Sequence, residues 1–138
     1  MSEFVNTPQF PVTPWEVVED QLDPEQLKGR ETLFALANGY LGIRGSFEEG
    51  RLVARAGTFI NGFYETEPIN YAESAYGFAR KRQKMLNITD GTSIELYVGE
   101  DPLDLATGRV LQHRRVLDLR EGTLRRELEW ESPSGVCI

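Results

Sequence analysis

Residues 109–131 read RVLQHRRVLDLREGTLRRELEWE, and this stretch has the pattern of a β-hairpin. Its first half, Arg109 to Leu119, is rich in residues that favour strands, and Glu121-Gly122 is a typical turn signal. In the second half, apolar residues alternate with charged ones up to Trp130, so one face of this strand is expected to be buried. The stretch therefore predicts two antiparallel strands joined by a tight turn.

Strand-like segments recur about every ten residues in much of the remaining chain. The further candidates are Trp15–Glu19, Glu31–Phe47, Thr58–Tyr64, Ile94–Val98 and a strand that begins at Val136, with turns at Asp101-Pro102 and at Ser132–Gly135. One helical turn is predicted for Asp23–Lys28, because Asp suits an N-cap, Pro suits the first helical position and Gly29 follows as a stop. Short strands with little helix predict an all-β fold, an antiparallel β-sandwich.

Four glycines interrupt the strand candidates: Gly39, Gly42, Gly45 and Gly62. The first three follow the spacing G-x-x-G-x-x-G, which differs from the G-x-G-x-x-G of dinucleotide-binding loops and lies among strand residues. We therefore interpret all four as structural glycines at bulges or close backbone contacts.

The segment from Pro68 to Lys84 has little alternation, and we predict a long loop there, with at most one helical turn. Loops of this length tend to carry function. Tyr71 and Tyr76 lie on it, whereas most other aromatic residues are expected in the core. Residues 1–14, with three prolines, are expected to form an extended arm that precedes a single domain over 15–138.

The composition indicates which binding partners and which cellular compartment to expect. The net charge is −7, with 15 basic and 22 acidic side chains, and a negative surface repels nucleic acid and anionic membranes, so neither is an expected partner. A single cysteine, Cys137, excludes an internal disulfide framework. The first residues lack the features of a signal peptide, and we expect a cytoplasmic protein.

No self-contained catalytic device is visible in the sequence. The chain has one histidine, His113, and one cysteine, which cannot supply a closed zinc site, and it has no phosphate-binding P-loop. We interpret His113 as an ordinary strand histidine. Carboxylates are abundant, but no spacing singles out a pair for glycosidic chemistry, so no catalytic residue and no metal ligand is assigned to this chain.

Five segments in order resemble the N-terminal domain of glycoside hydrolase family 65. They are Trp15–Glu19, the signature ETLFALANGYLGIRGSFEEG at residues 31–50, Gly57–Glu65, Met85–Asp90 and Arg115–Gly122. The resemblance runs over nearly the whole chain after Pro14. It implies a galactose-mutarotase-like supersandwich, truncated here, whose (α/α)₆ catalytic barrel is absent from this chain.

The resemblance also implies a function for the parent enzyme. Most members cleave an α-linked glucose disaccharide such as maltose, trehalose or kojibiose with inorganic phosphate, inverting the configuration to give β-glucose 1-phosphate. A general acid on the barrel protonates the bridging oxygen, so no catalytic residue is expected here, and phosphate is a co-substrate with no cofactor. The parent is expected to be a homodimer. This domain would buttress its own barrel, and Tyr71, Glu73 and Tyr76 would lie at the mouth of the substrate cleft.

Two alternatives stay open from the sequence. The first is a freestanding carbohydrate-binding or protein-interaction module. The parent would also be a hydrolase if water replaced phosphate as the attacking group. The residues of this chain do not discriminate among the candidate disaccharides.

Overall fold

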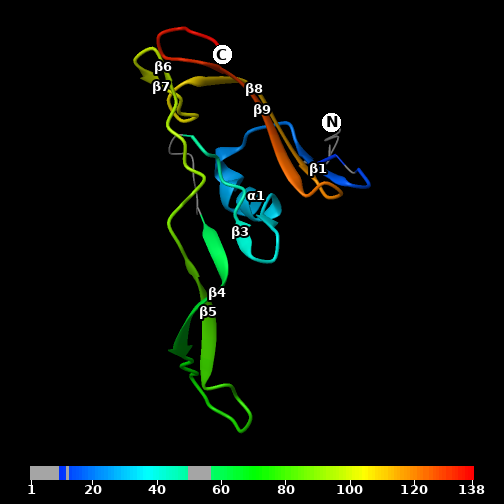
Figure 1. The fold of residues 1–138 in the computed structure, drawn as a ribbon, viewed down its shortest axis with the longest axis vertical. Coiled ribbons are helices and arrows are strands. Elements are labelled where there is room, and N and C mark those ends of the chain that lie inside the picture. Colours follow the sequence, from blue (N-terminus) through cyan, green and yellow to red (C-terminus); the bar gives the residue numbers. More distant parts are fainter. Residues whose placement is uncertain (1–9, 12, 50–56) are drawn as a thin grey trace, which may run out of the picture.

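The computed structural model describes residues 10–11, 13–49 and 57–138, and it consists mainly of antiparallel sheets with one short α-helix (Figure 1). The all-β class expected from the sequence is therefore confirmed. Most of the expected N-terminal arm, residues 1–9 and 12, lies outside the described residues.

The predicted hairpin is present as β8 (Arg109–Asp118) and β9 (Thr123–Glu131). With β1 (Glu16–Glu19) it forms a three-stranded sheet in the order β1-β8-β9. Asp118 closes the turn, because its carboxylate accepts hydrogen bonds from the backbone N–H groups of Glu121 (3.0 Å) and Arg120 (2.8 Å), which lower the pKa of Asp118. The turn residue Gly122 has a φ of +63°.

The second sheet has the order β2-β3-β4-β5 and ends in a long arm. It comprises β2 (Leu36–Ala37), β3 (Leu41–Ile43), β4 (Thr58–Pro68) and β5 (Lys81–Asn87). Strands β4 and β5 extend away from the rest of the molecule (Figure 1). Within β4, the φ of Gly62 is +88° and the register shifts between Phe59 and Tyr64, as in a β-bulge.

The predicted loop over Pro68–Lys84 is too long, because Lys81–Lys84 belong to β5. These residues lack apolar alternation, so periodicity could not identify the strand. Charge pairs across the two strands take its place: Arg82 lies opposite Glu67 with an Nε–Oε1 distance of 2.5 Å, and Lys84 lies opposite Glu65.

The predicted helical turn is correct at its start and wrong at its end. Asp23 accepts a hydrogen bond from the backbone N–H of Glu25 at 3.0 Å and caps a 3₁₀ turn over Pro24–Gln26. The chain then continues into α1 (Leu27–Leu33), so Gly29 does not stop the helix.

The strand expected from Glu31 is also wrong over its first three residues, which belong to α1. Tertiary contacts explain this outcome. The buried residues Arg30 and Glu31 fix the helix against the body, and the Glu31 carbonyl accepts a hydrogen bond from the Gly45 N–H at 2.8 Å.

The strand expected over Ile94–Val98 is present only as β6 (Tyr97–Val98), and Ile94 and Leu96 are exposed. β6 pairs with β7 (Asp101–Pro102), so the expected turn at Asp101-Pro102 is displaced to the preceding residues, where Gly99 has a φ of +65°. Alternation alone therefore overstated this strand.

The end of the chain follows the expected path. The turn after β9 is closed by a hydrogen bond from Gly135 N–H to the Ser132 carbonyl at 2.9 Å, and Cys137 then bridges Glu131 in antiparallel fashion.

An apolar cluster fills the body between the β8–β9 hairpin and the helix. Its buried members are Leu27, Phe47, Leu103, Leu105 and Trp130.

Beside this cluster lies a buried set of charged residues centred on Glu19, which is 1% exposed. One carboxylate oxygen of Glu19 is 2.7 Å from Nε2 of His113 and 3.1 Å from a guanidinium nitrogen of Arg115. The other oxygen is 2.9 Å from Nη1 of Arg30. The set therefore ties β1, α1 and β8 together.

Opposing effects determine the ionisation of this set. Burial raises the pKa of Glu19, but the hydrogen bond from His113 and the charges of Arg115 and Arg30 outweigh it, so the pKa is lowered. Burial lowers the pKa of Arg115, although Glu19 opposes that shift. The carboxylate form of Glu19 is thus the form that the fold stabilises.

Glu19→Gln is expected to lower the free energy of unfolding at neutral pH by about 3–5 kcal/mol, because it leaves buried guanidinium groups without a carboxylate. The Glu19 pKa is lowered on folding, so the stabilisation is present above the unfolded value of 4.5 and is lost as the pH falls through the folded value. Urea unfolding at about pH 7 and about pH 3 measures both effects. Glu16→Gln, on the exposed part of the same strand, is the control, and an equal loss in both variants would contradict the prediction.

Gly45→Ala is expected to destabilise the fold by about 1–3 kcal/mol, because overpacking displaces neighbouring groups. A Cβ at this position would lie 2.5 Å from Cβ and 2.6 Å from the carbonyl oxygen of Phe34. Thermal unfolding checks this against Gly91→Ala, where a Cβ would meet nothing within 4 Å. Equal melting temperatures for the two variants would show that the close approach is unimportant.

Candidate functional site

The end of the β4–β5 arm carries the three residues that the sequence singled out. Tyr71, Glu73 and Tyr76 lie in the connection between Pro68 and Lys81. A hydrogen bond from the Ile69 N–H to the Arg80 carbonyl (3.0 Å) closes the base of this connection. The connection contains turns and bends but no helical turn.

The three residues do not converge on one pocket. Tyr71 stacks at an angle on Phe78, with ring centroids 4.9 Å apart, and both rings line a hollow of about 390 Å³. Tyr76 is 107% exposed and projects into solvent, and Glu73 is exposed outside the hollow. The arrangement presents aromatic surface to a partner or ligand, without an acid or a base aimed at a common point.

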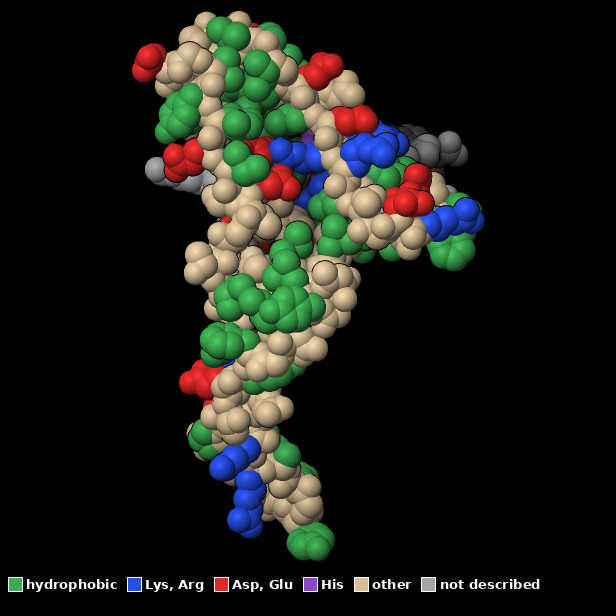
Figure 2. Space-filling model, viewed as in Figure 1, with side chains coloured by type: hydrophobic (Ala, Val, Ile, Leu, Met, Phe, Trp, Pro, Cys, Tyr) green, Lys and Arg blue, Asp and Glu red, His purple; other side chains and the backbone are tan. Residues whose placement is uncertain are grey.

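The arm is also more basic than the rest of this acidic chain. Arg80, Lys81, Arg82 and Lys84 are exposed within five residues, and Figure 2 shows basic side chains along the lower arm. Of these, Arg82 is paired with Glu67 at 2.5 Å. The arm therefore combines exposed aromatic rings with positive charge.

The expectation that most aromatic residues lie in the core is wrong for the candidates considered. Seven are exposed: Trp15, Tyr40, Phe63, Tyr64, Tyr71, Tyr76 and Phe78. The physical reason is that most of them lie on the arm or on the turn next to it, where no second layer among the described residues covers them.

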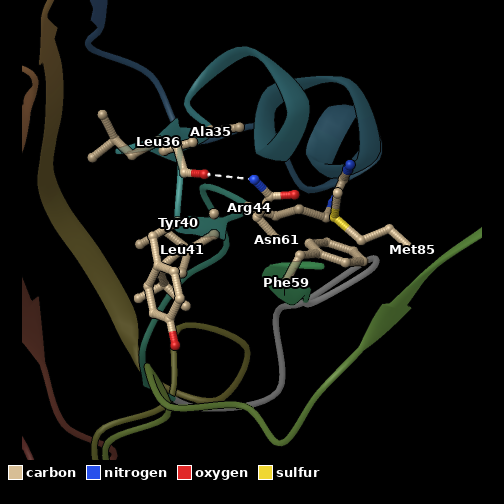
Figure 3. A pocket seen from close by; sticks show the side chains of 12 residues that line it. Ala35, Leu36, Tyr40, Leu41, Arg44, Phe59, Asn61 and Met85 are labelled. Carbon is tan, nitrogen blue, oxygen red and sulfur yellow. Dashed lines mark hydrogen bonds between the residues drawn. The ribbon is translucent and has the colours of Figure 1, made fainter. Parts of the chain in front are cut away.

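A second surface feature is an apolar groove of about 410 Å³ where β2, β3 and β4 meet (Figure 3). Its walls include Leu36, Tyr40, Leu41, Phe59 and Met85. The Asn61 side chain donates a hydrogen bond to the Gly39 carbonyl at 3.1 Å across one end of it, shown as the dashed line in Figure 3.

The structural glycines cluster around this groove and the body beneath it. Gly39 has a φ of +86° in the turn between β2 and β3. A Cβ on Gly42 would make ordinary contact with Ala37 at 3.5 Å, whereas Gly45 lies directly against Phe34. Gly62 lies at the bulge in β4.

Several acidic groups of the body and its histidine are engaged in structural contacts. Arg126 lies 3.0 Å from Glu48 and 2.6 Å from the buried Glu49, so one guanidinium group is paired with both carboxylates. His113 is buried against Glu19, and Cys137 is free and exposed. These contacts hold the fold and leave no nucleophile beside a base among them.

Among the residues that the structure describes, no three His, Cys, Asp or Glu side chains are grouped so as to hold a metal ion. None of the helices in the described ranges is long and apolar enough to cross a membrane.

Sequence reasoning missed the buried charged set and the groove. A period of two along β8 places His113, Arg115 and Leu117 on one face, and this signal marks the histidine as inward-facing. The groove carried no such signal, because residues 35–44 form it only together with Phe59, Asn61 and Met85 from later strands.

Comparison with known proteins identifies close relatives. The model of the glycosyl hydrolase family 65 N-terminal domain matches residues 17–138. An uncharacterized glycosyl hydrolase of Mycobacterium tuberculosis is 44% identical over 91% of this chain and 16% of its own length. The α,α-trehalose phosphorylase of Thermoanaerobacter brockii is 42% identical over 100% of this chain and 18% of its own length.

A solved structure agrees with these matches. A proposed kojibiose phosphorylase from the human microbiome is 29% identical and superimposes with a TM-score of 0.73, covering 88% of this chain and 16% of that one. This neighbour supports the β-sandwich class. The chain spans about one sixth of the length of its relatives. It belongs to glycosyl hydrolase family 65, and the part matched is that family's N-terminal domain.

Proposed function

We propose that this chain is the non-catalytic N-terminal domain of a cytoplasmic, homodimeric disaccharide phosphorylase. The observation that carries the proposal is the 42% identity over the whole chain to a trehalose phosphorylase. The parent would cleave an α-linked glucose disaccharide with inorganic phosphate and release β-glucose 1-phosphate. Residues 15–138 would form the sandwich domain, with the catalytic barrel elsewhere in the parent.

The chemistry of such a reaction fits the contacts in this domain. Inverting cleavage needs one carboxylic acid to protonate the leaving oxygen and an external nucleophile on the opposite face of the sugar. Inorganic phosphate would be that nucleophile, so no second carboxylate and no organic cofactor are required. Glu19, Glu48 and Glu49 are held by arginines and do not suit the role of a proton donor. The acid would therefore come from the barrel.

The arm would bring Tyr71, Glu73 and Tyr76 to the mouth of the substrate cleft. Its extension away from the body supports this role, because it is long enough to contact another part of the parent (Figure 1). Exposed aromatic rings offer flat apolar surface for the face of a sugar ring. The nearby Arg80, Lys81 and Lys84 supply positive charge, which favours an anionic co-substrate near an otherwise acidic chain.

A hydrolase is the second candidate for the parent. The observation that favours it is the 44% identity to a Mycobacterium tuberculosis protein named a glycosyl hydrolase. The two candidates share this domain and differ in whether phosphate or water attacks the anomeric carbon. A freestanding carbohydrate-binding or interaction module is a weaker alternative, since the relatives are about six times longer than this chain.

The full-length parent is expected to degrade maltose, trehalose or kojibiose only when inorganic phosphate is present, because phosphate is the attacking group. Proton NMR of the first turnovers should show β-glucose 1-phosphate and free glucose. Glucose formation at the same rate without phosphate would replace the phosphorylase proposal with the hydrolase. Turnover by residues 1–138 alone would contradict the non-catalytic role of this domain.

Tyr76→Ala in the full-length parent is expected to raise the KM for the disaccharide or lower kcat, reducing kcat/KM by roughly 2- to 12-fold. This corresponds to the loss of an aromatic contact of about 0.5–1.5 kcal/mol. Steady-state kinetics on the variant and on Tyr97→Ala, an exposed tyrosine away from the arm, give the comparison. If Tyr76→Ala shows wild-type kinetics and an unchanged melting temperature, the proposed position of the arm at the substrate cleft is contradicted.

A further inference from the structure

We propose that the groove beside Tyr40 is an internal docking surface that receives apolar side chains from the remainder of the parent chain. Tyr40 would be the anchor of this contact. The inference rests on the proposed function in one respect, namely that this domain is joined to a larger catalytic portion. It goes further by assigning the residues through which the two portions meet.

The lining of the groove is the first argument. Tyr40 is 67% exposed, and Leu41 and Met85 are also exposed, although all three are large apolar side chains. Leu36 and Phe59 line the same groove, so its described lining is mainly apolar (Figure 3). Contiguous apolar surface of this kind marks an interaction site in a folded protein.

Hydrogen bonds hold the turn that presents Tyr40 in one conformation. The Asn38 carboxamide oxygen accepts from the backbone N–H of Tyr40 (3.0 Å) and of Leu41 (2.8 Å). From the other side, the Asn61 backbone N–H donates to the Tyr40 carbonyl at 2.8 Å. The Tyr64 hydroxyl donates to the Asn61 side chain at 2.8 Å, which orients that side chain toward Gly39.

The result is a rigid backbone that carries an exposed aromatic ring. A preorganised anchor loses little conformational entropy on binding, and aromatic anchors dominate the energetics of interfaces. A tyrosine held in this way on the surface is better explained by a partner than by solvation.

The polar groups of the groove argue against a small charged ligand or a sugar. Among the residues that the structure describes, Arg44 is the only charged one in its lining. Its guanidinium group is already engaged, at 2.9 Å from the Thr32 hydroxyl and 3.1 Å from the Lys28 carbonyl. Sugar recognition needs several free donors and acceptors, whereas this groove offers mainly apolar contact.

The length of the relatives argues for one occupant. The chain makes up 16% to 18% of its closely similar relatives, so more than four fifths of such a protein lies outside it. A covalently joined segment is present at a high effective concentration, which favours it over a separate molecule at the same surface. The remainder of the parent is therefore the partner that the groove fits.

Hydroxyl-radical footprinting of the intact full-length parent tests the proposal without any substitution. The oxidation rates of Tyr40 and Met85 are measured by mass spectrometry in the native protein and in urea, and the native rates are expected to be at least about tenfold lower. Native rates close to the unfolded rates would overturn the proposal. Protection that disappears on dilution to a monomer would also overturn it, because a second copy would then be the occupant.

A substitution series on the same protein separates docking from local folding. Tyr40→Ala is expected to lower the melting temperature of the full-length parent by a few degrees, whereas Tyr40→Phe keeps the ring and should match the wild type. Tyr97→Ala is the control at a residue of similar exposure, 63%. Equal melting temperatures for all four proteins would contradict the anchor role.

The outcomes remain distinct from those of the proposed function. Loss of phosphate dependence in the activity assay would revise the reaction of the parent and leave the protection of Tyr40 unaffected. Normal phosphorolysis together with an unprotected Tyr40 would overturn the docking surface alone.

Discussion

The carboxylate of Glu19 is the constraint on which the body of this domain depends. A buried charge is tolerated only when it is paired and hydrogen-bonded, and Glu19 meets this condition through His113, Arg115 and Arg30. Because these partners come from β8 and α1, the carboxylate fixes the helix and the sheet relative to each other. Removing it would leave the remaining charges buried without compensation.

Arg115 transmits this constraint to the segment that precedes the arm. Its guanidinium group donates to the Gly45 carbonyl at 2.6 Å and lies over the rings of Phe34 and Phe47, 4.1 Å and 4.8 Å from their centroids. Gly45 must be a glycine for the chain to pass this close to Phe34. The charged set therefore positions Gly45, which directly follows the groove-lining residues 35–44. The arm itself is held by pairing between β4 and β5.

The sequence predicted elements whose signals are local and missed those that depend on distant partners. The β8–β9 hairpin follows from alternation and a turn at Gly122, and the helix start follows from Asp23 and Pro24. The continuation into α1 depends on contacts from residues far along the chain, and no periodicity around Gly29 announces it. For the candidate site, composition predicted a functional loop, but not that its tyrosines would point to different surroundings.

Besides its buried apolar cluster, this domain exposes many large apolar side chains and buries several charged ones. Hydrogen-bonding capacity is concentrated inside, around Glu19, while large rings such as Trp15 and Tyr40 are exposed. A small domain has little apolar area to bury and cannot leave much of it in water and remain stable. Partners that cover the exposed rings would remove this apolar area from water. The remainder of the proposed parent chain would supply such partners without the entropic cost of association. Under the docking proposal, the inward charges specify the internal geometry, and the outward rings would hold the domain in place within a larger protein.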